Sequence, residues 1–322
     1  MPKRQSTTHS SREIPGKLTG EREKSALAAV PPIIWALVAV IAALSMLVGY
    51  LLANGNSGAG NQAAQEQTAQ EQPAQPGQPG NAAQPGQPGQ PVTYPPAGTR
   101  NEPPQPKADG TFDATIVGPG KEIKSAEDIL HVHRRKANDP FAIGALDAPV
   151  VVSEFSDFEC PFCSRHANTT EPQILKEYVE KGLVRLEWND LPINGPKAVA
   201  GAKAGRAAAE QGKFFEFKEA LYKASESTNG HPEYGMEDFV KFAEEAGVKD
   251  IAAFKKAASG SKFDDAVQEA RMYGAGIGIN GTPGFIIGTQ FVNGAQPWEV
   301  FKQAIDAELS KVASGEVKVP AV

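Results

Sequence analysis

The chain's only two cysteines stand three positions apart, in Cys160-Pro161-Phe162-Cys163, directly after an apolar, β-branched run over residues 149–156. A run of this length and composition is typical of a buried strand. After the second cysteine, apolar residues at 174, 175, 178, 179 and 183 recur at helical spacing. The sequence therefore predicts a buried strand that leads, through the cysteine pair, into a helix whose N-terminus carries Cys160.

The remaining chain from residue 111 onward mixes strand and helix patterns. Strands are predicted at 112–117 and 183–191 and a hairpin at 282–292, with helices that start at Ser125 and Pro297. Five further helices are predicted between the second strand and the hairpin, at 197–210, 214–224, 236–246, 250–258 and 263–273. We therefore expect one α/β domain over residues 111–322, with a helical insertion at about 194–275.

The cysteine spacing predicts redox chemistry. Free N–H groups and the dipole at a helix N-terminus lower the pKa of a thiol there, so Cys160 is the predicted nucleophile. Cys163 lies one turn deeper and is the predicted resolving thiol. A structural disulfide is the weaker alternative because it closes a very small loop. A zinc site with His166 as third ligand is also disfavoured, since no fourth ligand is evident.

The histidines are expected to be ordinary structural residues rather than functional ones. His166 is expected on the surface of the first helical turns, with a smaller chance of tuning the thiolate. His131 and His133 are two positions apart and would lie on different faces of a helix, so a metal pair is not expected there. No metal and no cofactor beyond the Cys160–Cys163 disulfide is expected.

The run from Phe155 to Cys163, the helical insertion and the run from Gly281 to Phe285 together resemble the DsbA-like thiol-disulfide oxidoreductases of the thioredoxin superfamily, in particular their membrane-tethered Gram-positive forms. The resemblance covers roughly residues 148–310. It implies a thioredoxin-like core around the helical insertion, and an active site in which Pro161 and Phe162 support the two cysteines.

The same resemblance implies roles for three further residues. Pro283 would form a cis peptide bond and face the disulfide, and the backbone of Thr282 would pair with the substrate. Glu154 would be a buried acid that accepts or relays the proton of Cys163; the alternative is a solvated glutamate at the strand end. An ordinary trans proline in an edge strand is the alternative for Pro283.

One departure from the family concerns the position of Phe162, where the best-known oxidants carry histidine. Phenylalanine can offer neither a hydrogen bond nor a positive charge to a thiolate. The acidic neighbours Asp157 and Glu159 are expected to oppose ionisation of Cys160 as well. The motif alone therefore does not predict strong oxidising power.

The N-terminal third predicts a membrane anchor. Residues 30–53 contain no charge and are long enough to cross a hydrocarbon core of about 30 Å. The 1–29 leader carries six Lys or Arg against three Glu, which favours a cytoplasmic N-terminus. A cleaved signal peptide is the alternative. Residues 54–110, with their QPG repeats, predict a disordered Pro/Gly/Gln-rich linker.

The charge balance of the chain limits the kinds of partner that we expect. Asp and Glu number 38 against 32 Lys and Arg, and no long basic run occurs, so nucleic acid is not an expected partner. We expect a single-pass membrane protein whose extracytoplasmic domain oxidises exported proteins with cysteine pairs. A membrane protein linked to quinone would reoxidise it. The alternatives are a reductase or isomerase with the same fold, or a binding module that does no chemistry.

Overall fold

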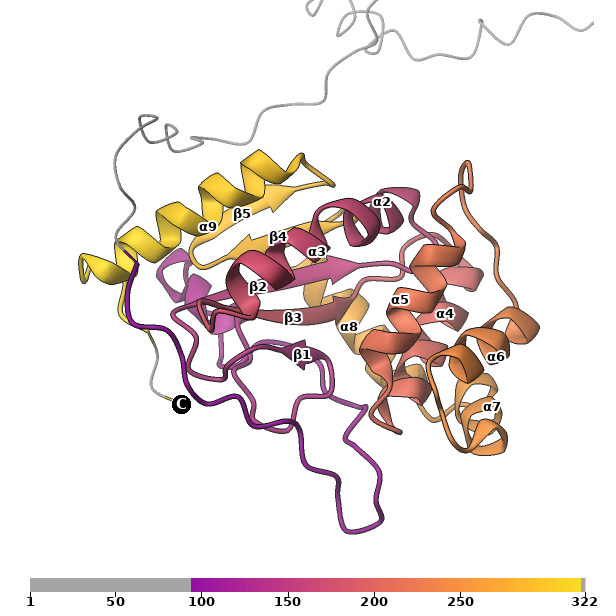
Figure 1. Cartoon of the computed structure of the whole chain (residues 1–322). Coiled ribbons are helices and arrows are strands. Elements are labelled where there is room, and N and C mark those ends of the chain that lie inside the picture. Colours follow the sequence, from indigo (N-terminus) through magenta and orange to yellow (C-terminus); the bar gives the residue numbers. More distant parts are fainter. Residues whose placement is uncertain (1–93, 320–321) are drawn as a thin grey trace, which may run out of the picture. The chain divides into compact units, whose positions relative to one another are not determined.

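The computed structural model describes residues 94–319 and residue 322, and it contains one five-stranded sheet (Figure 1). The strand order is β1-β3-β2-β4-β5. The central strands β2 and β3 are parallel, whereas each of the other neighbouring pairs is antiparallel. The bounds are β1 Ala142–Ile143, β2 Val150–Ser156, β3 Val184–Asp190, β4 Gly284–Ile287 and β5 Gln290–Asn293. This arrangement is the predicted α/β, thioredoxin-like fold.

Strand β2 is buried along its whole length, and its side chains alternate between two apolar layers. Val150 and Val152 pack in a cluster with Phe301 of the last helix. Phe155 belongs to the cluster on the opposite face, which also contains Ile286. Both faces of the sheet are therefore covered, which explains why β2 lacks the polar alternation of a strand at the surface.

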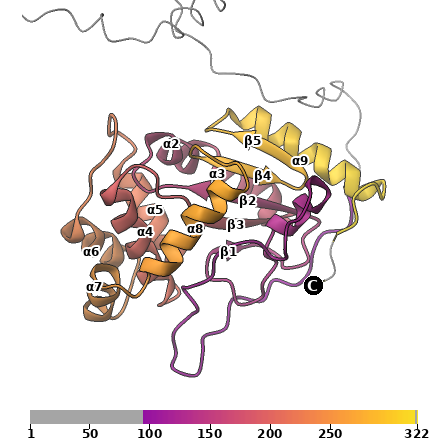
Figure 2. The ribbon, with the colours of Figure 1, turned by 180° about the vertical axis from the view of Figure 1, so that it is seen from behind.

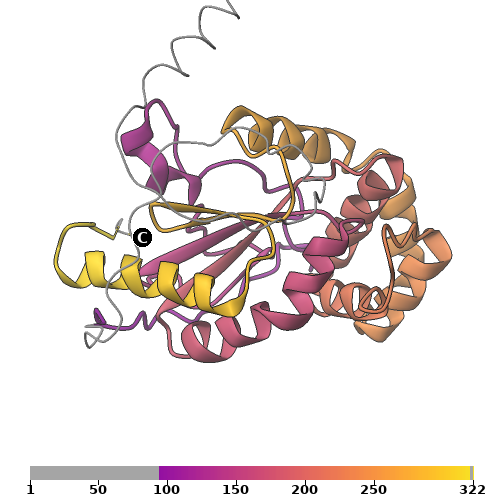
Figure 3. The ribbon, with the colours of Figure 1, turned by 90° about the horizontal axis from the view of Figure 1, so that it is seen from above.

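Figure 3 shows helices on both sides of the sheet. On one side lie α2 (Pro161–Thr169), α3 (Glu171–Ile174), a π-helical turn (Leu175–Val179) and α9 (Trp298–Ala313). The other side is covered by α8 (Asp264–Gly276) and a 3₁₀ helix (Ala126–Val132), as Figure 2 shows from behind. The helix after the cysteines is interrupted at Thr170, two residues before Pro172, whose ring lacks an N–H donor.

The predicted helical insertion lies between β3 and β4. Besides α8 it contains α4 (Pro196–Ala209), α5 (Phe214–Ala224), α6 (Met236–Glu245) and α7 (Ile251–Ser259). Glycine lets α4 approach the loop that precedes the cysteines: a Cβ added at Gly205 would lie 2.8 Å from the ring of Phe158. The insertion thereby packs directly beside the redox motif.

Two of the expected elements near the start of the domain differ from prediction. Residues 112–117 form no strand, and β3 instead pairs at its outer edge with β1, which the sequence did not predict. The backbone carbonyls of Ala114 and Ile116 instead accept hydrogen bonds from the buried guanidinium of Arg206. The helix that starts after Ser125 is a 3₁₀ helix of seven residues that ends before His133.

The segment for which we predict a disordered linker is described from Tyr94 onward. There the hydroxyl of Tyr94 donates to Asp306 of α9 at 3.0 Å, and the N–H of Gly98 donates to the carbonyl of Gly182. This part of the chain is thus attached to the domain. The predicted leader and membrane span lie outside the described residues, and within residues 94–319 no helix is long and apolar enough to cross a membrane.

Candidate active site

The two cysteines lie at the start of α2, shortly after the end of β2. Cys160 is the residue immediately before α2, and Pro161 occupies the first helical position, where a missing N–H costs no hydrogen bond. Both cysteines are free thiols. Cys160 keeps 5% of its surface exposed and Cys163 none. The difference in access is that expected for an attacking and a resolving thiol.

The surroundings of Cys160 stabilise its thiolate. A hydrogen bond from the thiol of Cys163 has the largest effect, and a hydrogen bond with Thr282 and the backbone N–H groups of Cys163 and Phe162 add to it. The pKa of Cys160 therefore falls to about 6 despite burial. We expected the helix N-terminus to be the main cause. The buried partner thiol contributes more, and sequence reasoning did not identify this effect.

Cys163 has the opposite electrostatic character. Burial raises its pKa well above the ordinary value of a thiol, and its hydrogen bond to Cys160 adds to this effect. The hydroxyl of Ser156 partly opposes the increase. Ser156 lies 3.3 Å from the hydroxyl of Tyr222, which comes from α5 of the insertion. At neutral pH the reduced pair therefore holds one proton, on Cys163.

The loop before β4 faces the nucleophile. The peptide bond between Thr282 and Pro283 is cis, and the carbonyl oxygen of Thr282 lies 3.3 Å from the sulfur of Cys160. Residues 122 positions apart in the sequence are thus brought together by the pairing of β2 with β4. Backbone rather than a titratable side chain meets Cys160 on this side.

Glu154 lies on the face of β2 that carries Val150 and Val152, and it is fully buried. Its Oε2 is 3.3 Å from the ammonium of Lys218 in α5, which also binds Glu171 at 2.6 Å. Burial alone would lower the pKa of Lys218, but the two carboxylates outweigh this effect and raise it. The ammonium group is therefore the counter-ion of both buried acids.

Sequence reasoning missed Lys218, although the sequence contains a signal. The buried stripe of α5 consists of Phe214, Phe217, Lys218, Leu221 and Tyr222. A lysine within an apolar helical stripe is a candidate buried charge that requires an acidic partner. The partner Glu171 has no comparable signal, because it lies in a short helix created by the interruption at Thr170.

The expectation that His166 lies on the surface is wrong. The side chain is fully buried, with its ring 4.5 Å from that of Phe285 and 4.9 Å from that of Phe301. Neither ring nitrogen has a hydrogen-bond partner within the described part of the chain. Burial lowers its pKa to about 3, so His166 is neutral. His166 lies on the inner face of α2, which is covered by Phe285 of β4 and Phe301 of α9.

One group of side chains could in principle ligate a metal. Ligand atoms of Glu154, His166 and Glu171 lie within 4.8 Å of one another. The ammonium of Lys218 already binds both carboxylates, which leaves little need for a further cation. The two cysteines do not join His166 in any such group among the described residues.

Asp157 and Glu159 engage loops of the insertion. The carboxylate of Asp157 accepts hydrogen bonds from the backbone N–H groups of Ile193 and Asn194. That of Glu159 accepts them from Glu233 and Tyr234. Burial raises the pKa of both acids, and these bonds oppose the increase. Their main contact is thus with loops that border the motif, which sequence reasoning did not predict.

Phe162 is 53% exposed, so the motif presents an apolar ring beside the nucleophile. The guanidinium of Arg165, one helical turn further, lies 5.1 Å from the centre of this ring. The backbone N–H of Phe162 helps to lower the pKa of Cys160.

Comparison with known proteins shows which family has this geometry. The family model described as "Thioredoxin" matches residues 136–307, and that described as "DsbA, N-terminal domain" matches residues 58–132. The chain belongs to the DsbA-like thiol-disulfide oxidoreductases. The "Probable disulfide bond formation protein D" of Bacillus cereus is 30% identical over 196 residues, which cover 58% of this chain and 89% of the relative. Its Bacillus anthracis counterpart is 29% identical over 57% of this chain and 87% of its own length.

Among solved structures, a point variant of alpha-DsbA1 from Wolbachia pipientis is similar in fold. The TM-score is 0.50 at 19% sequence identity, and the match covers 60% of this chain and all of that chain. The enzyme is thus a protein-disulfide oxidoreductase by family, with Cys160 and Cys163 as its only thiols.

Proposed function

We propose that this DsbA-like protein is an extracytoplasmic oxidase that introduces disulfide bonds into exported proteins with cysteine pairs. The observation that carries the proposal is the unequal thiol pair. Cys160 has a pKa of about 6, whereas the pKa of Cys163 is raised. A stabilised thiolate at Cys160 favours the reduced enzyme, and an enzyme whose reduced form is favoured oxidises its substrates.

The proposed reaction has two steps. A substrate thiolate attacks the sulfur of Cys160, the Cys160–Cys163 bond breaks, and a mixed disulfide forms while Cys163 leaves as a thiolate and takes up a proton. The second substrate thiolate then attacks the substrate sulfur of the mixed disulfide and expels Cys160 as a thiolate. The substrate loses two electrons and two protons. The enzyme gains both electrons and keeps one proton on Cys163, and the second proton passes to water.

Supporting roles follow from neighbouring groups. The backbone of Thr282, 3.3 Å from Cys160, would pair with the substrate chain, with Pro283 shaping that loop. Glu154, whose Oε1 has no hydrogen-bond partner among the described residues, would relay the proton of Cys163. No cofactor beyond the disulfide is required by these steps. A membrane protein that passes electrons to quinone would reoxidise the enzyme, which would itself be anchored through residues 30–53 with its N-terminus in the cytoplasm.

The decisive experiment is the reduction potential of the Cys160–Cys163 pair. Because Phe162 offers no side-chain donor, we expect a value above the roughly −270 mV of thioredoxin and below the roughly −120 mV of the strongest oxidants. The enzyme should also promote the oxidative refolding of a reduced, unfolded protein. A potential at or below that of thioredoxin, without oxidation of this substrate, would favour a reductase; absence of any exchange would favour a binding module.

Trapping of mixed disulfides tests which of the two thiols is the nucleophile. Cys163→Ala should accumulate mixed disulfides at Cys160, since the resolving thiol is missing, whereas Cys160→Ala should trap few. Non-reducing electrophoresis of the two variants gives the comparison. Equal trapping by both would contradict the assignment of Cys160 as the nucleophile.

A further inference from the structure

A surface groove begins at the nucleophile and runs away from it between α2 and α9. Its first part, about 610 Å³, is lined at one end by Phe162 and Thr282, which flank Cys160. A second part, about 540 Å³, continues along α3 and the π-helical turn. Gln173 and Trp298 line both parts, so the two lie next to each other. A chain joined to Cys160 has its neighbouring residues at the mouth of this groove.

The groove is basic in an otherwise acidic chain. Its charged lining consists of one acid, Glu177, and four bases, Arg165, Lys176, Lys181 and Lys302. Lys181 binds Glu177 at 2.8 Å, and Lys302 binds Asp306. Arg165 and Lys176 form no salt bridge with any described residue, and both are exposed. Two positive charges without a salt-bridge partner among the described residues thus lie along the groove.

Arg165 is fixed at the end of the groove nearest to Cys160. One guanidinium nitrogen donates to the carbonyl of Ala295 at 3.0 Å, and the group lies over the ring of Phe162. Of its five N–H donors, one is thereby used and the others remain available. A guanidinium held in place in this way is suited to bind a carboxylate with little loss of side-chain entropy.

We propose that this groove selects substrates whose cysteine is flanked by acidic residues, with Arg165 and Lys176 as specificity-determining residues. The inference rests on the proposed exchange at Cys160 and adds a substrate class to it. Positive charges without partners in the groove attract an acidic segment and disfavour a basic one. Phe162 and Trp298 supply apolar contact area beside these charges.

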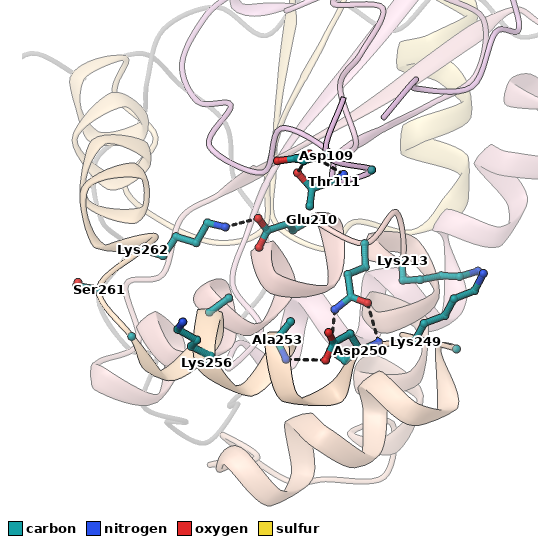
Figure 4. Close-up of a pocket in the computed structure, with 15 residues that line it drawn as sticks. Asp109, Thr111, Glu210, Lys213, Lys249, Asp250, Ala253, Lys256, Ser261 and Lys262 are labelled. Carbon is teal, nitrogen blue, oxygen red and sulfur yellow. Dashed lines mark hydrogen bonds and ion pairs between the residues drawn. The ribbon is translucent and has the colours of Figure 1, made fainter. Parts of the chain in front are cut away.

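A larger cavity elsewhere in the domain provides a matched control. It has a volume of about 940 Å³, lies in the insertion around α7, and contains neither cysteine (Figure 4). Lys249 and Lys256 line it, and neither lines the groove. Lys262 of the same cavity turns toward Glu210. Replacing Lys249 and Lys256 by glutamine changes the net charge by the same amount as replacing Arg165 and Lys176.

The test measures oxidation of dithiol peptides by the oxidised protein. The peptides share one sequence around two cysteines and carry Glu, Gln or Lys on both sides. Because flanking Glu raises the pKa of the peptide's own thiols, the quantity compared is the Glu-to-Lys ratio of kcat/KM in each protein variant. We expect this ratio to fall about tenfold in Arg165→Gln/Lys176→Gln, through KM, and to fall similarly for the wild type in about 1 M salt.

The control variant Lys249→Gln/Lys256→Gln should keep the wild-type ratio, and Arg165→Lys should keep most of it. An unchanged ratio in Arg165→Gln/Lys176→Gln, or an equal fall in the control variant, would overturn the proposal. Oxidation of the Gln peptide by the wild type tests exchange itself. Affinities of the same peptides with Ser in place of Cys, followed by tryptophan fluorescence, test the groove even without exchange, and they should rank Glu above Gln above Lys.

Discussion

Two buried charge clusters lie on opposite faces of the sheet, and they differ in chemistry. On the face covered by α8, the guanidinium of Arg134 donates to Asp139 at 2.6 Å and to the carbonyl of Trp188 at 2.8 Å, while Glu187 accepts from the backbone N–H of Arg134. On the other face, Lys218 binds Glu154 and Glu171 beside a neutral His166.

The first cluster is built on arginine, whose charge does not change at any physiological pH. The second consists of lysine, glutamate and histidine, which can exchange protons, and it leaves Glu154 Oε1 and both nitrogens of His166 without partners among the described residues. It lies on the face of β2 that carries Glu154, the strand that leads to the cysteines. From this contrast we expect a structural role for the Arg134 cluster, and we propose a role in proton balance for the Lys218 cluster.

The largest effect is expected for Arg134→Met, which leaves Asp139 buried without its counter-ion. We expect a loss of about 4 kcal/mol in the free energy of unfolding, measured by urea denaturation. The Cys160 pKa, followed by thiolate absorbance, should not change. Lys181→Met is the control, because its pair with Glu177 is exposed and its loss should barely change the stability.

Lys218→Met should lower the free energy of unfolding by somewhat less, about 3 kcal/mol. The reason is that one of the two carboxylates left without a counter-ion can take up a proton. The loss should be smaller at pH 5 than at pH 8, since the uptake is easier at low pH. Urea denaturation at both pH values checks this. If the loss is the same at both, the cluster does not exchange protons and resembles the Arg134 cluster after all.

Much of the fold around these clusters could be predicted from the sequence. Spacing and composition are local, and they located β2, the cysteines at the start of α2, the five helices of the insertion and the hairpin of β4 and β5. Resemblance to a family placed Thr282 and Pro283 opposite Cys160, as the structure has them. All of these features are carried by short runs of residues.

Features that depend on contacts between distant segments were missed. The inward orientation of His166 depends on α9 packing over α2, and the partners of Glu154 come from α5 and α3. At 112–117, where no strand forms, the carbonyls of Ala114 and Ile116 bind the distant Arg206. In each case the deciding partner is remote in sequence, and periodicity carries no information about it.

His166→Leu tests the titration of the second cluster directly. The folded pKa is about 3 and the unfolded one about 6.5, so below pH 6.5 the unfolded state binds a proton that the folded state does not. Stability is thus lost as pH falls from 6.5 toward 3. At pH 5 the loss from this residue is about 2 kcal/mol, and the leucine variant should lack it.

Urea denaturation of wild type and variant between pH 5 and 7 measures the difference. His231→Leu is the matched control, because His231 is exposed and its replacement should leave the pH dependence of the wild type in place. If His166→Leu retains the full pH dependence, protonation of His166 does not limit stability at low pH.

The smallest effect is expected at the motif itself, for Phe162→His. A protonated histidine stabilises the Cys160 thiolate, so the pKa of Cys160 should fall and the reduction potential should rise. Arg165 lies 5.1 Å from this ring and would oppose protonation of the new histidine. The gain should therefore be limited, to about 30 mV, which corresponds to about 1.4 kcal/mol. Adding Arg165→Gln should enlarge it, and Phe162→Leu should leave the potential unchanged. A fall in potential on Phe162→His would show that the new side chain does not stabilise the thiolate, and would contradict the expected effect of its charge.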